Sequence, residues 1–522
     1  MSDADAPVRR AELVALLSLG TDLGLGQPME HMIRACLIAL RLAERVGLDD
    51  AERGVVYYSG LLAWVGCHTD AYEQAKWLGD DLSVKSDTHY EYDFGKAGPA
   101  AAFLLKHIGG AGSPLLQRAR IGMRFMGDGR RALAALAENH YLATDALADG
   151  LGLGEHVRTS LKESYERWDG KGAYGLRGEQ IGIGSRLVNL ADVVEVFRRT
   201  GGVEAAIAVA RERSGTQFDP GIVELFCEQA ALIFADLDAA ASWELVIDSE
   251  PSLAAAVVAG DELDGALAAI GEFAELKSPW LMGHSRGVAD LAGEAARGLG
   301  LPESDVTALR RAAFVHDIGR LGVSNAVWDK PGELTQSELE RVRLHPYLTE
   351  RMLSFSAALA PLGSIAGQHH ERLDGSGYPR GLSGDAISHA GRVLAAADAY
   401  HAMTAARPHR PALTAAEAAV ALRAQVASSR LDGAAVDAVL RAAGHRVRRR
   451  REWPAGLTPR EVEIVRLLAR GLTARAIADR LGISPKTAGS HIEHIYLKTG
   501  ASNRAQLSLF AMKYGLMSEQ GQ

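Results

Sequence analysis

Apolar residues recur at spacings of three and four along most of this chain. Residues 32–48 and 288–301 show the pattern clearly, and alanine, leucine, arginine and glutamate dominate it. This period places the apolar side chains on one face of an α-helix. Alternation of apolar and polar residues, which is typical of strands, is scarce. The pattern therefore predicts an all-α protein.

The helical pattern contains one long internal repeat. Four stretches of the first half align in the same order with four of the second: 31–48 with 284–301, 57–67 with 309–320, 140–147 with 345–352, and 165–193 with 370–399. A long period with only two units indicates a domain duplication and not a solenoid. We expect one helical bundle in residues 1–245 and a second in residues 246–445.

A third, smaller domain follows an arginine-rich stretch. Residues 446–455 read as a basic linker, and we expect four short helices in residues 456–522. Thr458 with Glu461 three residues later has the signature of a capping box at the start of the first helix. The short turn at 481–484 joins two predicted helices, as in a helix-turn-helix.

Composition limits the class of protein. A chain of 522 residues is too long for one ordinary core, and its net charge of −8 argues against nucleic-acid binding by the whole surface but leaves room for one basic module. No apolar run reaches about 18 residues, and the first residues lack the apolar segment of a secretion signal. The cysteines have no CxxC spacing, which excludes a cysteine zinc ribbon and suits a reducing compartment: Cys36, Cys67 and Cys227. We expect a cytoplasmic protein without a membrane span.

The second repeat collects side chains that commonly bind metal ions. They are His284, the pair His316–Asp317, His345, the pair His369–His370, and Asp398. Five imidazoles and two carboxylates exceed the needs of one zinc ion and suffice for two divalent ions that share a carboxylate, for which Asp317 is the natural candidate. A nitrogen and oxygen set without thiolates suits iron, manganese, cobalt or zinc. Two such ions clamp a phosphate and activate a bridging water, which predicts hydrolysis of a phosphoester.

These residues carry a resemblance to a known family. Residues 277–440 resemble the HD-GYP family of HD phosphohydrolases through HDIG at 316–319, HHERLDGSGYP at 369–379 and Asp398. The resemblance implies an all-α bundle that hydrolyses cyclic di-GMP to pGpG or GMP. It implies that the seven residues above are the metal ligands, with Asp317 as the bridging carboxylate for a metal-bound hydroxide. It also implies a set of substrate-binding residues: Arg320, Gly375, Gly377, Tyr378 and Pro379.

Two positions depart from the family pattern. The family usually has lysine after HDIG, where this chain has Arg320, which keeps the charge but changes the geometry offered to a phosphate. Members with three metals have a glutamate one turn before the first histidine, where this chain has Trp280. We therefore expect two divalent ions, iron or manganese.

The first repeat has lost most of this set. It keeps His31, His140 and Asp192, but the HD pair is replaced by Ala63–Trp64 and the HH pair by Ser164–Tyr165. We therefore hypothesise a degenerate, catalytically silent HD-GYP-like domain. It could be a structural partner, a sensor that kept the ligand pocket, or a site that retains a single metal.

The C-terminal domain resembles the DNA-binding domain of LuxR-type regulators. LTPREVEIVRLLARG, IADRLGISPKT and SNRAQ carry the match. The second helix of the helix-turn-helix, expected from about residue 485 to 498, would enter the major groove with four outward residues: Lys486, Thr487, Ser490 and His491. The resemblance implies a homodimer on double-stranded DNA.

Two classes of function follow from these features. The first is a metal-dependent phosphodiesterase, acting on a cyclic dinucleotide and coupled to transcription. The second is a transcription factor whose HD domains bind a nucleotide or metal with little or no turnover. The intact set of candidate ligands favours the enzyme, while the C-terminal domain favours a regulatory output.

Overall fold

Helices account for nearly all regular structure in the computed structural model. It describes residues 6–87, 103, 106–110, 114–124, 136–237, 242–445, 453–514 and 516. In these ranges the only named strands are β1 (Val8–Arg9) and β2 (Val257–Val258), which pair antiparallel with Val8 opposite Val258. The all-α prediction is therefore confirmed. The chain divides into two compact units, residues 1–445 and 446–522.

The first lobe comprises the described residues from 6 to 248. Its α-helices are α1 (Arg10–Gly24), α2 (His31–Arg45), α3 (Asp50–Leu62), α4 (Ala71–Leu78), α5 (Asp81–Ser86), α7 (Leu115–Arg124), α9 (Leu136–Gly150), α10 (Glu155–Glu163), α11 (Ile183–Glu212), α12 (Pro220–Ile233) and α13 (Ser242–Asp248). The 3₁₀ turns η2 (Val65–Asp70) and η5 (Gly178–Gln180) join some of them. Helices α2, α3 and α11 pack together as its centre.

The second lobe comprises residues 249–445 of the same unit. Its α-helices are α14 (Gly260–Glu275), α15 (His284–Leu299), α16 (Glu303–Val315), α17 (Asn325–Trp328), α18 (Gln336–Arg343), α19 (His345–Leu353), α20 (Ala360–Ala366), α21 (His389–Thr404), α22 (Ala415–Ala427) and α23 (Gly433–Ala442). The 3₁₀ turns are η6 (Ile318–Gly322) and η7 (Gly384–Ala386). Helix α15 packs against α16, α21 and α23.

The aligned stretches of the two lobes adopt the same order of elements. Helices α2 and α15 both begin at a histidine that follows a residue with positive φ, Glu30 or Gly283. Helices α3 and α16 each lead into a 3₁₀ turn, η2 or η6. Helices α11 and α21 each carry an aspartate as their tenth residue, Asp192 or Asp398. Corresponding positions of the sequence repeat therefore occupy corresponding positions of the fold.

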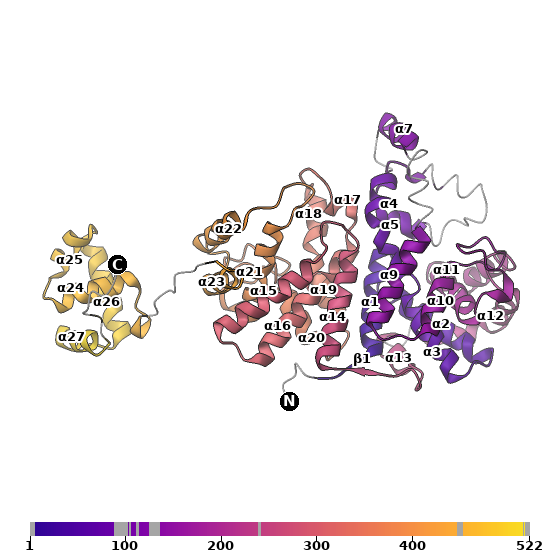
Figure 1. Ribbon diagram of the computed structural model, residues 1–522, viewed down its shortest axis with the longest axis horizontal. Helices are drawn as coiled ribbons and strands as arrows, with labels where there is room; N and C mark the ends of the chain where they lie inside the picture. The colour runs from indigo at the N-terminus through magenta and orange to yellow at the C-terminus, as the bar shows by residue number, and fades with distance from the viewer. Residues whose placement is uncertain are drawn as a thin grey trace. The chain divides into compact units, whose positions relative to one another are not determined.

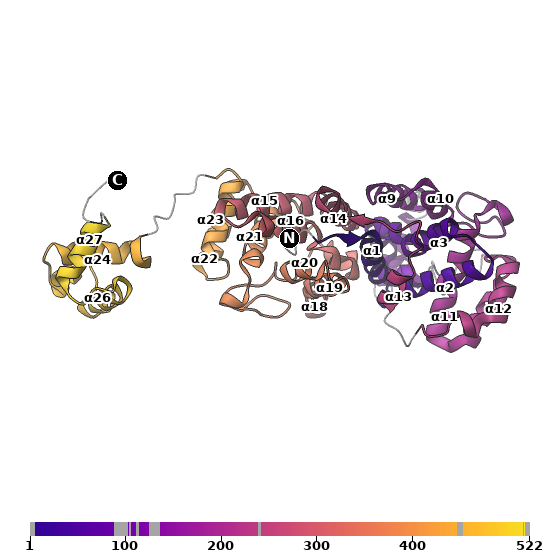
Figure 2. The same cartoon turned by 90° about the horizontal axis from the view of Figure 1, so that it is seen from below.

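Helix α1 joins the two lobes. It packs against α2 and α3 of the first lobe and against η6 and α19 of the second, and Figures 1 and 2 show it between them. Nearly all of its residues are buried, as expected for a helix enclosed on every side. A side chain at Gly20 would meet Leu321 of the second lobe, with the added Cβ 2.9 Å from Leu321 Cδ1. The first lobe therefore lies directly against the turn that follows the HD pair.

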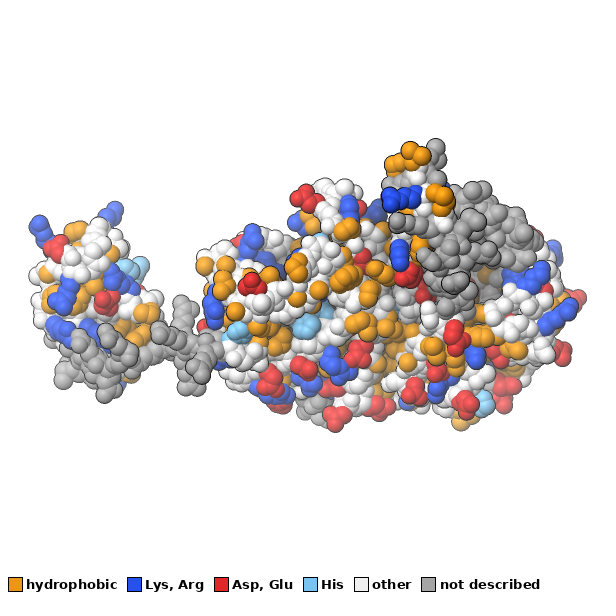
Figure 3. Space-filling model, turned by 45° about the horizontal axis from the view of Figure 1, so that its top comes forward, with side chains coloured by type: hydrophobic (Ala, Val, Ile, Leu, Met, Phe, Trp, Pro, Cys, Tyr) orange, Lys and Arg blue, Asp and Glu red, His pale blue; other side chains and the backbone are white. Residues whose placement is uncertain are grey.

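The C-terminal unit has four α-helices in its described part. They are α24 (Pro459–Ala469), α25 (Ala474–Leu481), α26 (Pro485–Thr499) and α27 (Arg504–Lys513). The capping box of Thr458 and Glu461 is present, and α26 covers the predicted second helix of the helix-turn-helix. Lys and Arg side chains project from the face of this unit seen in Figure 3. Most of the arginine-rich linker, residues 446–452, lies outside the described residues.

No helix among the described residues is long and apolar enough to cross a membrane.

Candidate metal centre

Separate elements of the second lobe bring the seven predicted ligands together. His284 and His345 are the first residues of α15 and α19, and Asp398 lies in α21. The pair His316–Asp317 occupies the junction of α16 and η6, and the pair His369–His370 follows α20. All seven are buried except His370, which is half-buried. Helix starts and junctions let the side chains converge without interrupting a helix.

The ligand atoms form two main groups. His284, His316 and Asp398 offer atoms that all lie within 4.8 Å of one another, and so do His345, His369 and His370. In the first group His284 Nε2 is 3.2 Å from Asp398 Oδ1. In the second, His345 Nε2 is 3.1 Å from His369 Nε2. Each group has the number of donors that a divalent ion takes from a protein while keeping positions for water or substrate.

Asp317 lies between the two groups. Its Oδ2 is 3.8 Å from His284 Nε2 and 3.7 Å from His316 Nε2. Its Oδ1 is 3.3 Å from His345 Nε2 and 3.5 Å from His369 Nε2. Each carboxylate oxygen thus faces a different group, which is the arrangement needed to bridge two ions.

Backbone carbonyls orient three of the imidazoles. His316 Nδ1 lies 2.7 Å from Ala313 O, and the Nδ1 atoms of His345 and His369 each lie 2.6 Å from the carbonyl oxygen three residues earlier. A carbonyl only accepts, so each Nδ1 carries the proton and donates it. The Nε2 lone pairs then point to the centre, which is the tautomer that a metal ligand needs.

The pKa shifts of His316 and Asp317 suit a metal, while the shift of His369 has the opposite sense. Burial lowers the pKa of His316 to about 4, which leaves this imidazole neutral at pH 7. Burial alone would raise the pKa of Asp317, but the Arg320 guanidinium and the neighbouring imidazoles hold it well below its usual range. For His369 the carboxylate of Asp317 outweighs burial and raises the pKa.

Two buried atoms at the centre lack hydrogen-bond partners within the described residues. They are His316 Nε2 and Asp317 Oδ1, one from the imidazoles and one from the carboxylates. Buried polar atoms are costly to leave unpaired. Neutral imidazole and ionised carboxylate are the forms that bind divalent ions, so these donors fit a metal centre.

A cavity of about 360 Å³ opens over this centre. Its floor includes His284, His345, His370 and Asp398. Its walls include Trp280, Arg320, Trp328, Tyr378, Arg407 and Arg410. Aromatic rings and guanidinium groups beside metal ligands suit a ligand that has both bases and phosphates.

Contacts in the cavity wall fix two of the predicted substrate-binding residues. The guanidinium of Arg320 lies over the ring of Trp328, 3.6 Å from its centroid, and Arg320 Nη1 is 3.0 Å from Asp317 Oδ2. The ring of Tyr378 lies 4.8 Å from the ring of His370. Both side chains are therefore held next to the candidate metal ligands.

The other three predicted substrate-binding residues lie in the same loop but not in the cavity lining. Gly375 has a φ of +77°, a region that favours glycine. A Cβ at Gly377 would lie 2.4 Å from the backbone nitrogen of Arg372, so this glycine lets the loop pack against itself. Gly375, Gly377 and Pro379 thus shape the loop that carries Tyr378, and their contact with substrate stays a prediction.

Glu371 organises this loop and was not predicted. It is buried, and its carboxylate accepts hydrogen bonds of 2.8 Å from the backbone N–H groups of Arg380 and Leu382. The aligned Glu166 of the first lobe accepts a 2.5 Å hydrogen bond from the backbone N–H of Tyr174. The sequence held a signal for this role, because the glutamate is kept in both repeats while the histidines before it are not.

Two more unpredicted residues position His284. Glu275 is buried and accepts hydrogen bonds from the backbone N–H groups of Gly283 and Ser285, at the start of α15. His401 lies one turn after Asp398, with its Nδ1 3.0 Å from His284 Nδ1. The spacing from Asp398 could have indicated His401, whereas nothing local indicates Glu275.

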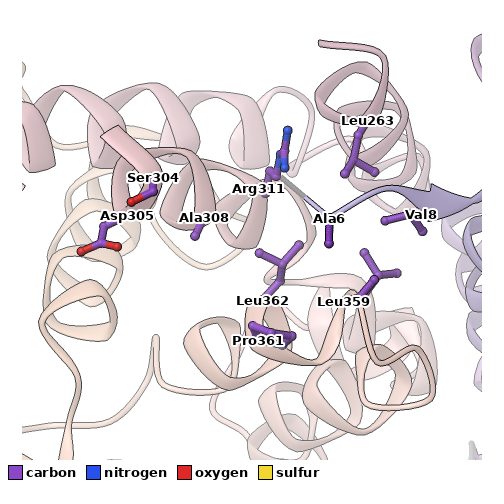
Figure 4. Close-up of a pocket in the computed structure, with 11 residues that line it drawn as sticks. Ala6, Val8, Leu263, Ser304, Asp305, Ala308, Arg311, Leu359, Pro361 and Leu362 are labelled. Atoms are coloured by element: carbon purple, nitrogen blue, oxygen red, sulfur yellow. The ribbon is translucent and has the colours of Figure 1, made fainter. Parts of the chain in front are cut away.

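A second cavity of the same lobe contains none of the seven residues. It has a volume of about 290 Å³ and lies between α14, α16, α20 and the N-terminal segment, as Figure 4 shows. Its lining is mostly apolar, and Arg311 there is paired with Asp264 at 2.5 Å. Among the described residues, none of the clusters able to hold a metal ion lies in its lining, and the cavity is separate from the candidate centre.

The corresponding place in the first lobe is filled by an ion pair and by aromatic rings. His31 lies 2.9 Å from Asp192 and 2.5 Å from Glu195. Burial alone would lower the pKa of His31, but these two carboxylates raise it to about 10. The rings of Trp64 and Tyr165 pack edge to face, 5.4 Å apart. In the described part of the chain, the side-chain clusters able to hold a metal ion all belong to the second lobe.

The predicted DNA-contacting residues lie on α26. Lys486, Thr487 and Ser490 are exposed and His491 is half-buried, while Ala488 and Ile495 are buried beneath them. The N-terminal part of the helix therefore presents polar side chains to solvent. Their contact with DNA stays a prediction.

Comparisons with family models and known proteins agree with this arrangement. A model described as HD domain matches residues 269–435, and one described as bacterial regulatory proteins of the luxR family matches residues 455–511. The chain is 33% identical to the 3'3'-cGAMP-specific phosphodiesterase 3 of Vibrio cholerae serotype O1, over 79% of this chain and 90% of that protein. It is 41% identical to the cyclic di-GMP phosphodiesterase response regulator RpfG of Xanthomonas campestris pv. campestris, over 30% of this chain and 41% of that protein.

A solved structure shows the same fold. The crystal structure of a cyclic GMP-AMP specific phosphodiesterase of V. cholerae aligns with a TM-score of 0.56 and 27% sequence identity, covering 85% of this chain and 99% of that one. The likeness extends over both lobes of the first unit, since it covers more of the chain than one lobe contains. The chain therefore belongs to the HD-GYP family of metal-dependent HD-domain phosphodiesterases, and it carries a luxR-family DNA-binding domain at its C-terminal end.

Proposed function

We propose that the second lobe hydrolyses a phosphodiester bond of a 3',3'-cyclic dinucleotide at a centre of two divalent ions. The observation that carries this proposal is the position of Asp317, whose two oxygens face separate groups of ligand atoms. One ion would be held by His284, His316 and Asp398, and the other by His345, His369 and His370.

Two substrates are supported by different relatives. Cyclic di-GMP is the substrate in the names of relatives that match 30% and 24% of this chain. On this chain we propose that its hydrolysis would give pGpG or GMP. A relative that matches 79% of the chain is named as specific for 3'3'-cGAMP. We therefore propose cyclic di-GMP and 3'3'-cGAMP as the two candidates.

The residues of the site have distinct tasks in this proposal. When bound, the two divalent ions stabilise charge on the phosphate and activate a water for attack on phosphorus. Asp317 and the six other ligands hold those ions, and the backbone carbonyls behind the imidazoles keep the Nε2 atoms directed inward.

The cavity walls would bind the rest of the dinucleotide. Arg320, held between Asp317 and Trp328, presents a guanidinium to the phosphate. Burial, with the nearby charge of Arg320, lowers the pKa of Arg407 to about 10, so it stays a cation at pH 7 and adds a second positive charge. Tyr378, Trp280 and Trp328 offer ring faces for base stacking.

Iron or manganese are the metals that we propose, because the donor set is rich in imidazole and carboxylate and contains no thiolate. Two ions per chain are expected, because the glutamate associated with a third ion is replaced by Trp280.

We further propose that the first lobe is a degenerate, catalytically silent HD-GYP-like domain. Its parallel order of helices supports a common origin of the two lobes. Its ion pair around His31 supports a structural role over a retained metal site, since a protonated imidazole cannot ligate a metal. Elemental analysis of the full chain tests this, because two ions per chain should all be lost when the second-lobe ligands are removed.

The C-terminal unit would bind a roughly palindromic double-stranded DNA site as a homodimer. Two apolar side chains of this unit are exposed, Leu497 at 80% and Tyr514 at 47%, and either could contribute to self-association. Nucleotide binding or turnover would be coupled to DNA affinity, and reciprocity requires that DNA change nucleotide affinity by the same factor. The alternative, a sensor with little or no turnover, shares this architecture.

An assay of dinucleotide hydrolysis by the purified protein, loaded with iron or manganese, decides between these functions. We expect cleavage of cyclic di-GMP, of 3'3'-cGAMP or of both, and its loss in Asp317→Ala. Asp290→Ala removes an exposed aspartate of the same lobe and should keep full activity. Metal-loaded protein that cleaves neither dinucleotide would contradict the enzyme and favour the sensor.

A further inference from the structure

A buried cluster of charges lies at the boundary of the two lobes. Asp81 of α5 is completely buried, and Lys85 of α5 and Lys277, just after α14, are each 2% exposed. Asp81 Oδ2 lies 3.4 Å from Lys277 Nζ and 3.6 Å from Lys85 Nζ. Burying three charged side chains is costly, so their arrangement calls for a function beyond simple packing.

The same aspartate holds the start of α17 in the second lobe. Asp81 Oδ1 accepts a hydrogen bond of 2.6 Å from the Ser324 hydroxyl and one of 2.7 Å from the backbone N–H of Asn325. Lys277, which Asp81 neutralises, donates to the carbonyl oxygen of Leu321 at 2.9 Å. Asp81 therefore anchors the segment 321–325 directly at one end and through Lys277 at the other. Figure 1 shows α4 and α5 beside α17 at this boundary.

The residues on either side of the segment 321–325, Arg320 and Trp328, form one wall of the cavity. Trp328 is the last residue of α17, and its ring supports the Arg320 guanidinium at 3.6 Å. The indole N–H of Trp328 also donates to the carbonyl oxygen of Arg320 at 3.4 Å, and its ring lies 5.4 Å from the ring of His345. A shift of α17 would therefore move Arg320 relative to the metal ligands.

We infer that Asp81, a residue of the lobe without candidate metal clusters, is a positioning residue for the Arg320–Trp328 wall of the active site in the other lobe. The inference rests on the proposed function, because it assigns Arg320 to the substrate phosphate. It gives the first lobe a defined part in substrate binding without any chemistry of its own. Loss of the negative charge would leave Lys85 and Lys277 as uncompensated buried cations and weaken both anchors of the segment 321–325, since a neutral amide oxygen accepts hydrogen bonds less strongly than a carboxylate.

Asp81→Asn in the full chain tests this role. We expect KM for the cleaved dinucleotide to rise about tenfold or more, while kcat changes by less than about threefold and the metal content stays unchanged. Asp219→Asn is the matched control, because Asp219 also caps a helix, at Gly221 N–H, and pairs with a cation, Arg186, but entirely within the first lobe. It should leave KM unchanged.

Amide hydrogen exchange gives a readout that does not depend on turnover. Exchange in residues 317–328 should become faster in Asp81→Asn, and in Asp219→Asn the faster exchange should be confined to the start of α12. If Asp81→Asn unfolds the protein, the double variant Asp81→Asn/Lys85→Met is used in its place. In that variant the three side chains keep the net charge that they have in the wild type. Unchanged KM together with unchanged exchange in 317–328 would overturn the inference. A wild-type protein that cleaves no dinucleotide would refute the proposed function, and the exchange measurement would still decide the role of Asp81.

Discussion

Gly319, the glycine of the HDIG motif, offers a sharp test of how the centre is packed. A Cβ at this position would lie 2.1 Å from the carbonyl oxygen of His345 and 2.7 Å from the backbone nitrogen of Thr349. Both atoms belong to the backbone of α19, so no side chain can rotate away. A carbon and an oxygen need more than 3 Å, so Gly319→Ala must separate η6 from α19 by about 1 Å. That displacement moves Asp317 away from His345.

Two effects of Gly319→Ala follow. Overpacking a tight core should destabilise the protein by about 1–3 kcal/mol. A displacement of about 1 Å between catalytic groups should reduce kcat/KM about 100-fold. Bound metal, measured by elemental analysis, should fall together with activity, because Asp317 and His345 belong to the same set of ligands.

A matched glycine separates this effect from a general cost of alanine. Gly298 lies in α15, and a Cβ there would meet nothing within 4 Å. Gly298→Ala should therefore keep wild-type kcat/KM and metal content, and should stabilise the helix by up to about 1 kcal/mol. Wild-type kcat/KM in Gly319→Ala would refute the proposal that close contact of η6 and α19 assembles the centre.

Three further predictions test other parts of the chain. Trp328→Leu removes the ring under Arg320, worth about 1 kcal/mol, so KM should rise about fivefold at unchanged metal content, and an unchanged KM would contradict the stacking role. Lys486→Ala should weaken binding to all DNA sequences alike and lower the slope of log affinity against log salt by about one, whereas an unchanged slope would place Lys486 away from phosphate. Because the pKa of His31 is raised from 6.5 to about 10, its stabilisation is complete below pH 6.5 and is lost as the pH rises toward 10. Tm should therefore fall more over this range in the wild type than in His31→Gln, and parallel curves would exclude an ion pair at His31.

The sequence predicted those features whose signal is local. Helical periodicity predicted the all-α class, and the capping box of Thr458 and Glu461 predicted the start of the first helix in the C-terminal unit. The convergence of the seven candidate ligands was also predicted, because motifs of fixed order in a duplicated bundle restrict where their side chains can meet. Each of these signals lies within a few residues or within a repeated pattern.

Contacts between distant segments of the chain have no local signal in the sequence. Asp81 reads as an ordinary aspartate at the start of a short helix, and its pairing with Lys277 depends on how the lobes pack. Glu275 reads as the polar end of an amphipathic helix, although it holds the start of α15. The cavity wall formed by Arg407 and Arg410 depends in the same way on the path of the chain after α21. Such residues need the tertiary structure to be recognised.

The aligned positions of Glu195 and His401 explain why the first histidine of each lobe has different surroundings. In the first lobe His31 contacts Asp192 through Nε2 and Glu195 through Nδ1. In the second lobe His284 contacts Asp398 through Nε2 and His401 through Nδ1. Glu195 and His401 stand at the same distance along their helices from Asp192 and Asp398. A carboxylate on each side of His31 holds it as an imidazolium, which satisfies the buried site with protein charges alone. In the second lobe a histidine stands in place of that second carboxylate, and His284 Nε2 faces Asp398 and Asp317, which are also candidate metal ligands.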